Sequence, residues 1–292
     1  MTVVARILRA VAIAACVPYL VLKVAWIAGS HAGIPAGSEL LEHRATMAVA
    51  NTVTVLMDAA VILLALALTR PWGRRVPGWA LLLPLWGATG LLAPIAVGFP
   101  LQLAAEASGG TTPVGDGGGE YLDAWVFGVV YTGFGVQALA LGGLFVLYVR
   151  ERWGASLTGA LPPGAGVRLP LCVAGLSLLA ACVHLRSAVD DPVAGGPDVL
   201  WALVTAAAAL LVVAPAPRVR TVVVLGWAGG SASSAWGAWA LLFSLADGPF
   251  DENRPSALLS LTYAGQMVAG GLLLLLGARL LAGRRAVPAG AV

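Results

Sequence analysis

Eight long apolar segments restrict the fold of this chain more than any other feature. Crossing the hydrocarbon core of a bilayer takes about 20 apolar residues in a helix. A lone span can pair all its backbone N–H and C=O groups only as a helix, so an all-α bundle with eight transmembrane helices is predicted. Hydrophobic residues make up 59% of the 292 residues and charged residues only 11%, too little polar surface to cover a soluble protein of this size. The segments lie at about 7–28, 46–69, 77–98, 124–149, 169–187, 199–217, 221–245 and 256–278.

The charged residues divide between alternate connections, and this predicts the orientation. The N-terminus, the even connections and the C-terminus contain thirteen of the sixteen arginines, whereas the odd connections contain twelve of the fourteen acids. Because an excess of arginine marks the cytoplasmic side, both termini are predicted to be cytoplasmic, in a multi-pass protein of the plasma membrane. The basic residues are spread over five inner segments and form no single patch, so no nucleic-acid partner is expected.

The predicted spans fall into two sets of four. The first half covers 1–153 and the second 168–292, with an internal linker rich in glycine and proline at 154–167. A glycine-rich loop at 105–120 is predicted to be external. Four spans per half would give both halves the same orientation in the membrane.

The two halves also share a pattern in their last spans. Phe134 precedes Gln137 by three residues and Tyr263 precedes Gln266 by three, and each glutamine lies thirteen residues before an arginine. This favours a parallel 4+4 repeat. The odd-numbered spans align poorly, so chance likeness between spans rich in leucine, alanine and glycine stays the alternative.

Polar side chains within the even spans share one depth. Asp58, Gln137, Thr205 and Gln266 each lie twelve or thirteen residues before the arginine that ends the span. At the helical rise this places them roughly 18–20 Å from the inner boundary. The residues between them and the arginines are almost all apolar. The bundle is therefore predicted to have a dry cytoplasmic half and a polar middle and outer half.

Two charged residues stand out in the outer half. Lys23 is the only lysine of the chain, and Asp58 is the only acid within the predicted spans. Ionisable groups inside a bilayer usually face the bundle interior or a wet cavity. Lys23 can reach Asp58 directly or through water, pair with Asn51, or extend outward to the head groups. The predicted ligand-binding residues are Asp58, Lys23, Asn51, Gln137, Gln266, Thr205 and Tyr19.

Several chemistries have no support in the sequence. We find no ligand spacing typical of a metal site, no phosphate-binding glycine loop followed by Lys-Ser/Thr, and no hydrolase elbow. No catalytic residue, metal or cofactor is therefore expected. His184, two residues before Arg186, is predicted to lie at the membrane interface, and the serines at 231, 233 and 234 to permit close helix packing.

Three classes of function remain. The first is a small-molecule carrier or permease whose polar cavity opens outward to an external ligand. The second is a membrane sensor or accessory subunit that acts through a membrane or cytoplasmic protein partner. The third, with least support, is an intramembrane enzyme acting on a lipid with Asp58, His184 or Lys23 as acid or base. In each class the lipid bilayer is the protein's surrounding partner.

Overall fold

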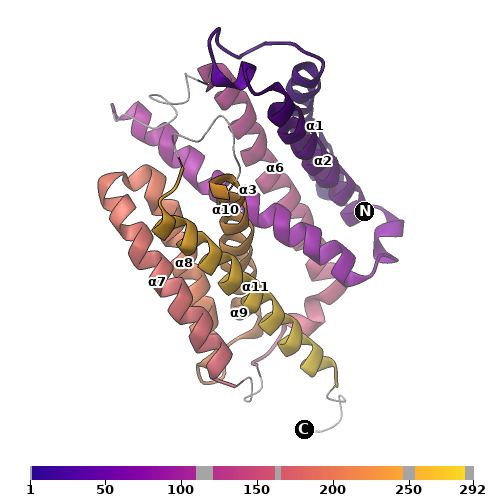
Figure 1. Ribbon diagram of the computed structural model, residues 1–292. Coiled ribbons are helices and arrows are strands. Elements are labelled where there is room, and N and C mark those ends of the chain that lie inside the picture. The colour runs from indigo at the N-terminus through magenta and orange to yellow at the C-terminus, as the bar shows by residue number, and fades with distance from the viewer. Residues whose placement is uncertain (1, 110–120, 162–165, 246–253, 287–292) are drawn as a thin grey trace. The chain divides into compact units, whose positions relative to one another are not determined.

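The computed structural model describes residues 2–109, 121–161, 166–245 and 254–286, nearly all of them helical (Figure 1). Within these ranges there is no strand, only an isolated antiparallel bridge between Ala160 and Arg218. Seven of the described helices are long and apolar enough to cross a membrane. The chain is thus an α-helical membrane protein, and this part of the prediction is confirmed.

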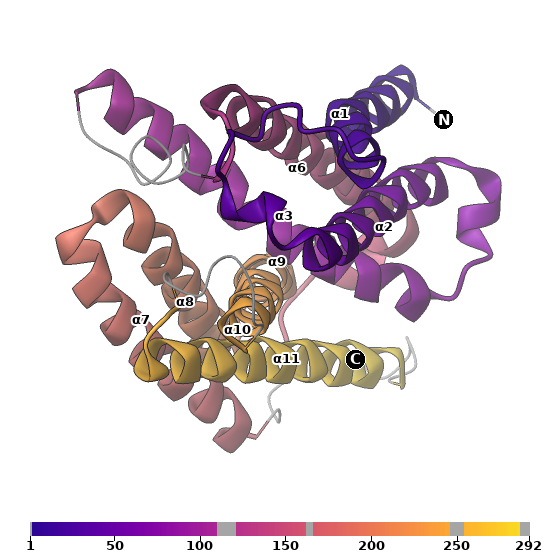
Figure 2. The same ribbon diagram turned by 45° about the horizontal axis from the view of Figure 1, so that its top comes forward.

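The remaining predicted span, at 221–245, is helical but divided. It consists of α9 (Val219–Ser231), a five-residue π-helix η4 (Ala232–Trp236) and α10 (Gly237–Leu245). Figures 1 and 2 show α9 and α10 following one another as one orange coil. Each piece alone is too short to cross a bilayer, so the count of eight spans stays a prediction.

The helices fall into two compact units, of which unit 1 comprises Met1–Ala88, Ile95–Tyr148 and Ala246–Arg254. Its first helix begins where the Thr2 hydroxyl accepts a hydrogen bond from the Ala5 backbone N–H. The first two helices pack directly against each other. Its elements are α1 (Val3–Ile27), η1 (Glu39–Leu41), α2 (Arg44–Thr69), η2 (Pro71–Arg74), most of α3 (Gly78–Ala107) and most of α6 (Ala124–Trp153).

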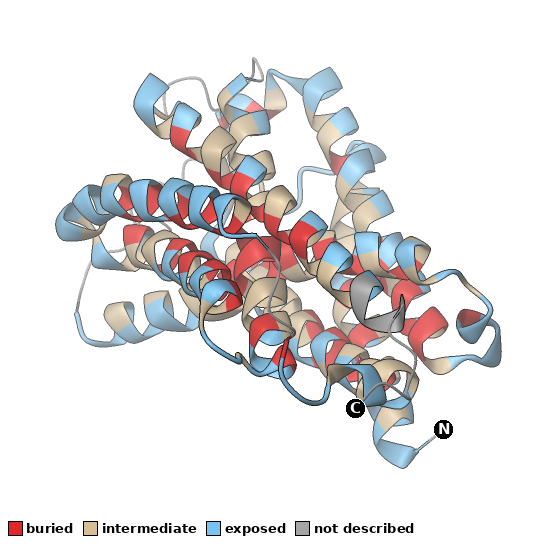
Figure 3. Cartoon of the chain, turned by 90° about the horizontal axis from the view of Figure 1, so that it is seen from below, coloured by how far each residue is buried: buried red, intermediate tan, exposed pale blue. Residues whose placement is uncertain are grey.

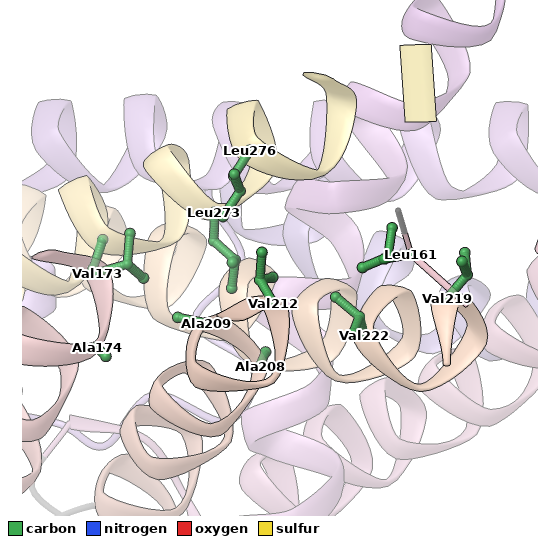
Figure 4. Close-up of a cluster of buried hydrophobic side chains, with 11 residues drawn as sticks. Leu161, Val173, Ala174, Ala208, Ala209, Val212, Val219, Val222, Leu273 and Leu276 are labelled. Atoms are coloured by element: carbon green, nitrogen blue, oxygen red, sulfur yellow. The ribbon is translucent and has the colours of Figure 1, made fainter. Parts of the chain in front are cut away.

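Unit 2 comprises Thr89–Pro94, Val149–Leu245 and Pro255–Val292. An apolar core forms where α7, α8, α9 and α11 meet (Figure 4). Buried residues alternate with exposed ones along these helices, as the red and pale blue segments of Figure 3 show. Besides α9, η4 and α10, the elements are η3 (Gly154–Leu157), α7 (Arg168–Asp190), α8 (Pro192–Val213) and α11 (Ala257–Ala286).

A single residue, Asp191, separates α7 from α8. Its carboxylate accepts a hydrogen bond from the Val193 N–H at 2.9 Å, and Pro192 is favourable in the first helical turn. The backbone of α8 passes so close to α7 that a Cβ on Gly195 would lie 2.5 Å from the Ala188 nitrogen. The two helices therefore form a tight antiparallel hairpin.

This hairpin corrects one boundary of the sequence prediction. The sixth predicted span begins at 199, but α8 begins at Pro192, so Asp198 lies within a helix and not in a loop. Other predicted features fall partly outside the described residues. These are 110–120 of the external loop, 162–165 of the internal linker, and the acids Asp116, Glu120, Asp247, Asp251 and Glu252.

Candidate functional site

The helices that correspond to the second, fourth, sixth and eighth predicted spans share one arrangement of buried side chains. These helices are α2, α6, α8 and α11. Each has a buried polar residue and, seven residues later on the same face, a buried apolar residue. Along each helix the interior face thus changes from polar to apolar within two turns, toward the end that bears the arginine. The pairs are Asp58 and Ala65, Gln137 and Leu144, Thr205 and Val212, and Gln266 and Leu273.

In unit 1, a carboxylate and an amide meet between α2 and α6. The Gln137 Nε2 donates to the Asp58 Oδ1 across 3.4 Å. Both side chains are buried, with Gln137 at 1% and Asp58 at 3% exposure. Two oxygens, Asp58 Oδ2 and the single amide oxygen Gln137 Oε1, have no hydrogen-bond partner. Two buried oxygens thus have no donor, which is costly unless a donor is supplied.

Lys23 is bound to Asn51 and stands beside two aromatic rings. Its Nζ donates to the Asn51 Oδ1 at 2.9 Å. The ammonium group lies 4.7 Å from the centroid of the Tyr19 ring and 4.8 Å from that of Trp26. Cation–π contact and a buried amide oxygen replace part of the water that a lysine loses in a bilayer. Lys23 was predicted to reach Asp58, to pair with Asn51 or to extend to the head groups. In the structure it pairs with Asn51.

A group of aromatic side chains adjoins these residues. The Tyr19 ring meets the Phe134 ring edge-on with 5.0 Å between centroids, and the Phe134 ring lies 6.2 Å from that of Tyr131. Phe99 adds a further contact to Tyr131 at 5.5 Å. Phe134 precedes Gln137 by one helical turn, so the aromatic group is next to the buried carboxylate–amide pair along α6.

Unit 1 also has an apolar groove along α1 and α6, with a volume of about 520 Å³. Small residues line it, among them Ala14, Ala15, Gly128 and Gly133. A Cβ on Gly133 would lie 3.1 Å from the Ala15 carbonyl oxygen, so glycine is what permits the close approach there. The groove is suited to an acyl chain or to a small-residue face of another helix.

Unit 2 contains its own polar cluster, made by α7, α8 and α11. The His184 Nε2 lies 3.1 Å from the Gln266 Oε1, and the His184 Nδ1 lies 3.7 Å from the Asp198 Oδ2. The Tyr263 hydroxyl donates to the same carboxylate oxygen at 3.5 Å. His184 is only 1% exposed. Its side chain is thus buried between helices.

Thr205 serves as an interhelical contact in the same unit. Its hydroxyl shares a 2.8 Å hydrogen bond with the Ser233 hydroxyl and donates to the Trp201 carbonyl at 2.8 Å. A Cβ on Gly229 would lie 2.6 Å from the Thr205 nitrogen. The sequence predicted close packing of this serine- and glycine-rich helix, and these contacts confirm it.

The seven predicted residues therefore fall into two groups, one in each unit. Lys23 contacts both Tyr19 and Asn51, and Asp58 contacts Gln137, all in unit 1. Thr205 and Gln266 belong to unit 2, and Gln266 is bound to His184. Sequence reasoning did not assign Asp198 and Tyr263 to a site. A short turn between α7 and α8 is the signal that could have identified Asp198. His184 and Asp198 lie seven residues on either side of Asp191, so a tight turn there brings them together.

Within the described ranges, no three His, Cys, Asp or Glu side chains group closely enough to hold a metal ion. The sites consist instead of paired ionisable and amide groups among apolar helices. Comparison with known proteins gives no match, whether with family models, curated proteins or solved structures. Fold and composition therefore define the class, a multi-pass α-helical membrane protein, and function has to be argued from the two polar clusters.

Proposed function

We propose that this protein is a small-molecule carrier of the plasma membrane, with a ligand site at Asp58 and Gln137. The observation that carries the proposal is the pair of buried oxygens, Asp58 Oδ2 and Gln137 Oε1, that accept no hydrogen bond. A cation or a group with two N–H donors would satisfy both and neutralise the carboxylate. The substrate class is thus a small organic cation or amine.

The neighbouring side chains suit such a ligand. Tyr19, Phe134 and Tyr131 supply ring faces for an apolar or cationic body. Asn51 holds Lys23, so the ammonium group is engaged 2.9 Å from an amide oxygen. The buried apolar faces beyond Ala65 and Leu144 would close the site on the inner side.

The proposal includes eight spans with both termini in the cytoplasm and the polar half facing outward. The continuous helical path from α9 through η4 to α10 supports the eighth span. A count of eight spans is also consistent with the alternation of arginine-rich and acid-rich connections.

A parallel repeat is supported by equivalent contacts in the two units. The Phe134 ring meets Tyr19 on α1, and the Tyr263 ring lies 5.4 Å from that of His184 on α7. Lys23 and Asn51 join α1 to α2, as His184 and Asp198 join α7 to α8. Each unit thus places a basic side chain opposite a polar one on its first helical hairpin.

The groove along α1 and α6 favours a second candidate, an accessory subunit that binds a partner's transmembrane helix. Four of its nine lining residues are alanine or glycine, as at the small-residue surfaces where membrane helices associate. A partner that co-purifies in stoichiometric amount, with no flux of solutes, would favour this candidate. Detection of a chemically modified lipid would instead favour the third class of function, an intramembrane enzyme acting on a lipid.

Ligand-induced stabilisation tests the carrier. Purified protein in detergent is heated with guanidinium, tetramethylammonium and a series of primary alkylamines, at equal ionic strength with sodium chloride as reference. At least one cation is expected to raise the melting temperature of the wild type but not of Asp58→Asn, and to be taken up by proteoliposomes. Asp123→Asn makes the same charge change outside the helices and is the matched control. Equal shifts in wild type and Asp58→Asn for every cation would contradict the proposal.

A further inference from the structure

The cluster in unit 2 has a geometry that fixes the position of one proton. The Gln266 Oε1 can only accept a hydrogen bond, so a hydrogen bond across the 3.1 Å to the His184 Nε2 requires a hydrogen on that nitrogen. In a neutral ring the Nδ1 would then hold a lone pair. That nitrogen faces the Asp198 Oδ2 at 3.7 Å, and a carboxylate oxygen also offers only lone pairs.

Two lone pairs facing each other in a dry interior repel, and an added proton turns this repulsion into attraction. We propose that His184 and Asp198 form a proton-binding site, with the proton on the His184 Nδ1. Uptake of one proton changes the charge of the pair from −1 to 0, as a neutral imidazole beside a carboxylate becomes an imidazolium–carboxylate pair. The 3.7 Å separation is then free to shorten to a charge-assisted hydrogen bond.

The other groups around the pair agree with this assignment. The Tyr263 hydroxyl donates to the Asp198 Oδ2 at 3.5 Å, so a hydroxyl and the imidazole meet at the same carboxylate oxygen. In the described part of α9, η4 and α10, the only ionisable side chain is Arg220, in the first turn of α9. On the hairpin itself, the remaining charged residues are Arg168 at the start of α7, and Arg186, Asp190 and Asp191 near the turn.

The carboxylate offers the route by which the proton would arrive. The Asp198 side chain is 16% exposed, whereas that of His184 is 2% exposed. Asp198 lies seven residues from Asp191, roughly 10 Å along the helix axis from the α7–α8 turn. The proton would thus reach the ring through the partly exposed acid. This second ligand is independent of whatever unit 1 binds.

Nitrogen NMR of histidine tests the site without any transport assay. His31 and His43, both exposed, are replaced by glutamine, so that His184 is the only ¹⁵N-labelled histidine in the full-length protein. Both ring nitrogens are expected to carry protons in the parent protein, because each of them faces an oxygen that can only accept a hydrogen bond.

Two variants separate the role of the carboxylate from packing. In Asp198→Asn, the amide can donate to Nδ1, so a neutral ring protonated only at Nε2 is expected at the same pH. Tyr263→Phe removes a hydroxyl without a charge, and both nitrogens should stay protonated. A neutral ring protonated at Nδ1 in the parent protein would overturn the proposal, and so would any ring state that is identical in the parent and in Asp198→Asn. The parent spectrum decides even where a variant fails to fold, and loss of cation binding at Asp58 would not alter it.

Discussion

Gln137 on α6 donates one hydrogen bond to Asp58 on α2, and the carboxylate and the amide each keep one buried oxygen without a donor. Unpaired acceptors at such burial are uncommon in folded proteins because each loses its hydrogen bonds to water. This relationship sets the position of the proposed ligand and the first prediction.

Replacing Asp58 by leucine is expected to abolish cation-dependent stabilisation while the protein still inserts and purifies as a monodisperse species. Leucine removes both carboxylate oxygens but is compatible with an apolar helix interior. The measurement is the melting temperature with and without the cation. An unchanged response to the cation would make Asp58 a structural residue.

Lys23 and Asn51 are expected to be energetically coupled. Lys23→Met leaves the buried Asn51 oxygen unpaired and should lower the free energy of unfolding by about 1–3 kcal/mol. In that background Asn51→Leu should cost less than in the wild type, with a coupling of about 1 kcal/mol. Thermal or denaturant unfolding of the four proteins measures this cycle. Additive losses would mean that the 2.9 Å hydrogen bond contributes nothing.

Adjacent glycines of α11 provide a matched test of close helix packing. A Cβ on Gly270 would meet the Gly230 carbonyl oxygen and lie 2.7 Å from the Ser234 nitrogen, whereas one on Gly271 would meet nothing within 4 Å. Gly270→Ala should destabilise the protein by about 1–3 kcal/mol. Gly271→Ala should be neutral or stabilise it by up to about 1 kcal/mol, through helix propensity. Equal effects of the two substitutions would contradict the packing of α11 against α9 and η4.

Reporter fusions test whether the segment from Val219 to Leu245 crosses the membrane. With eight spans, green fluorescent protein should fluoresce at both termini and after Pro217, and alkaline phosphatase should be active after Arg254. Only cytoplasmic fusions of the first fluoresce, and only exported fusions of the second are active. A C-terminal green fluorescent protein that does not fluoresce, together with a C-terminal alkaline phosphatase that is active, would indicate an odd number of spans.

Sequence alone predicted the apolar helices and the positions along them at which the interior face changes from polar to apolar. Asp58, Gln137, Thr205 and Gln266 are all buried, and each is followed on its face by a buried apolar side chain. Span length and helical periodicity are local properties, so these features could be read from the chain itself.

Pairing between helices could not be read in the same way. Gln266 was grouped with Asp58 by depth, but its partner is His184, because packing between helices decides which residues at one depth meet. Asp198 was taken for a loop acid because the sixth apolar span was predicted to begin at residue 199. In the structure Pro192 begins the helix and Gly195 permits contact with Ala188. The π-helix at Ala232–Trp236 has no local signature that we can identify.

The site at Asp58 in unit 1 is predicted to be reached by polar solutes from outside the cell. Asn51, Asp58 and Ala65 lie at intervals of seven on one buried face of α2, while Leu56 is 64% exposed on another face. Each position is replaced singly by cysteine in a protein whose own cysteines, Cys16, Cys172 and Cys182, are changed to alanine, and a charged, impermeant thiol reagent is added outside intact cells. Cysteines at 51 and 58 are predicted to react, and those at 56 and 65 to stay unmodified. A cysteine at 58 as unreactive as those at 56 and 65 would contradict the account.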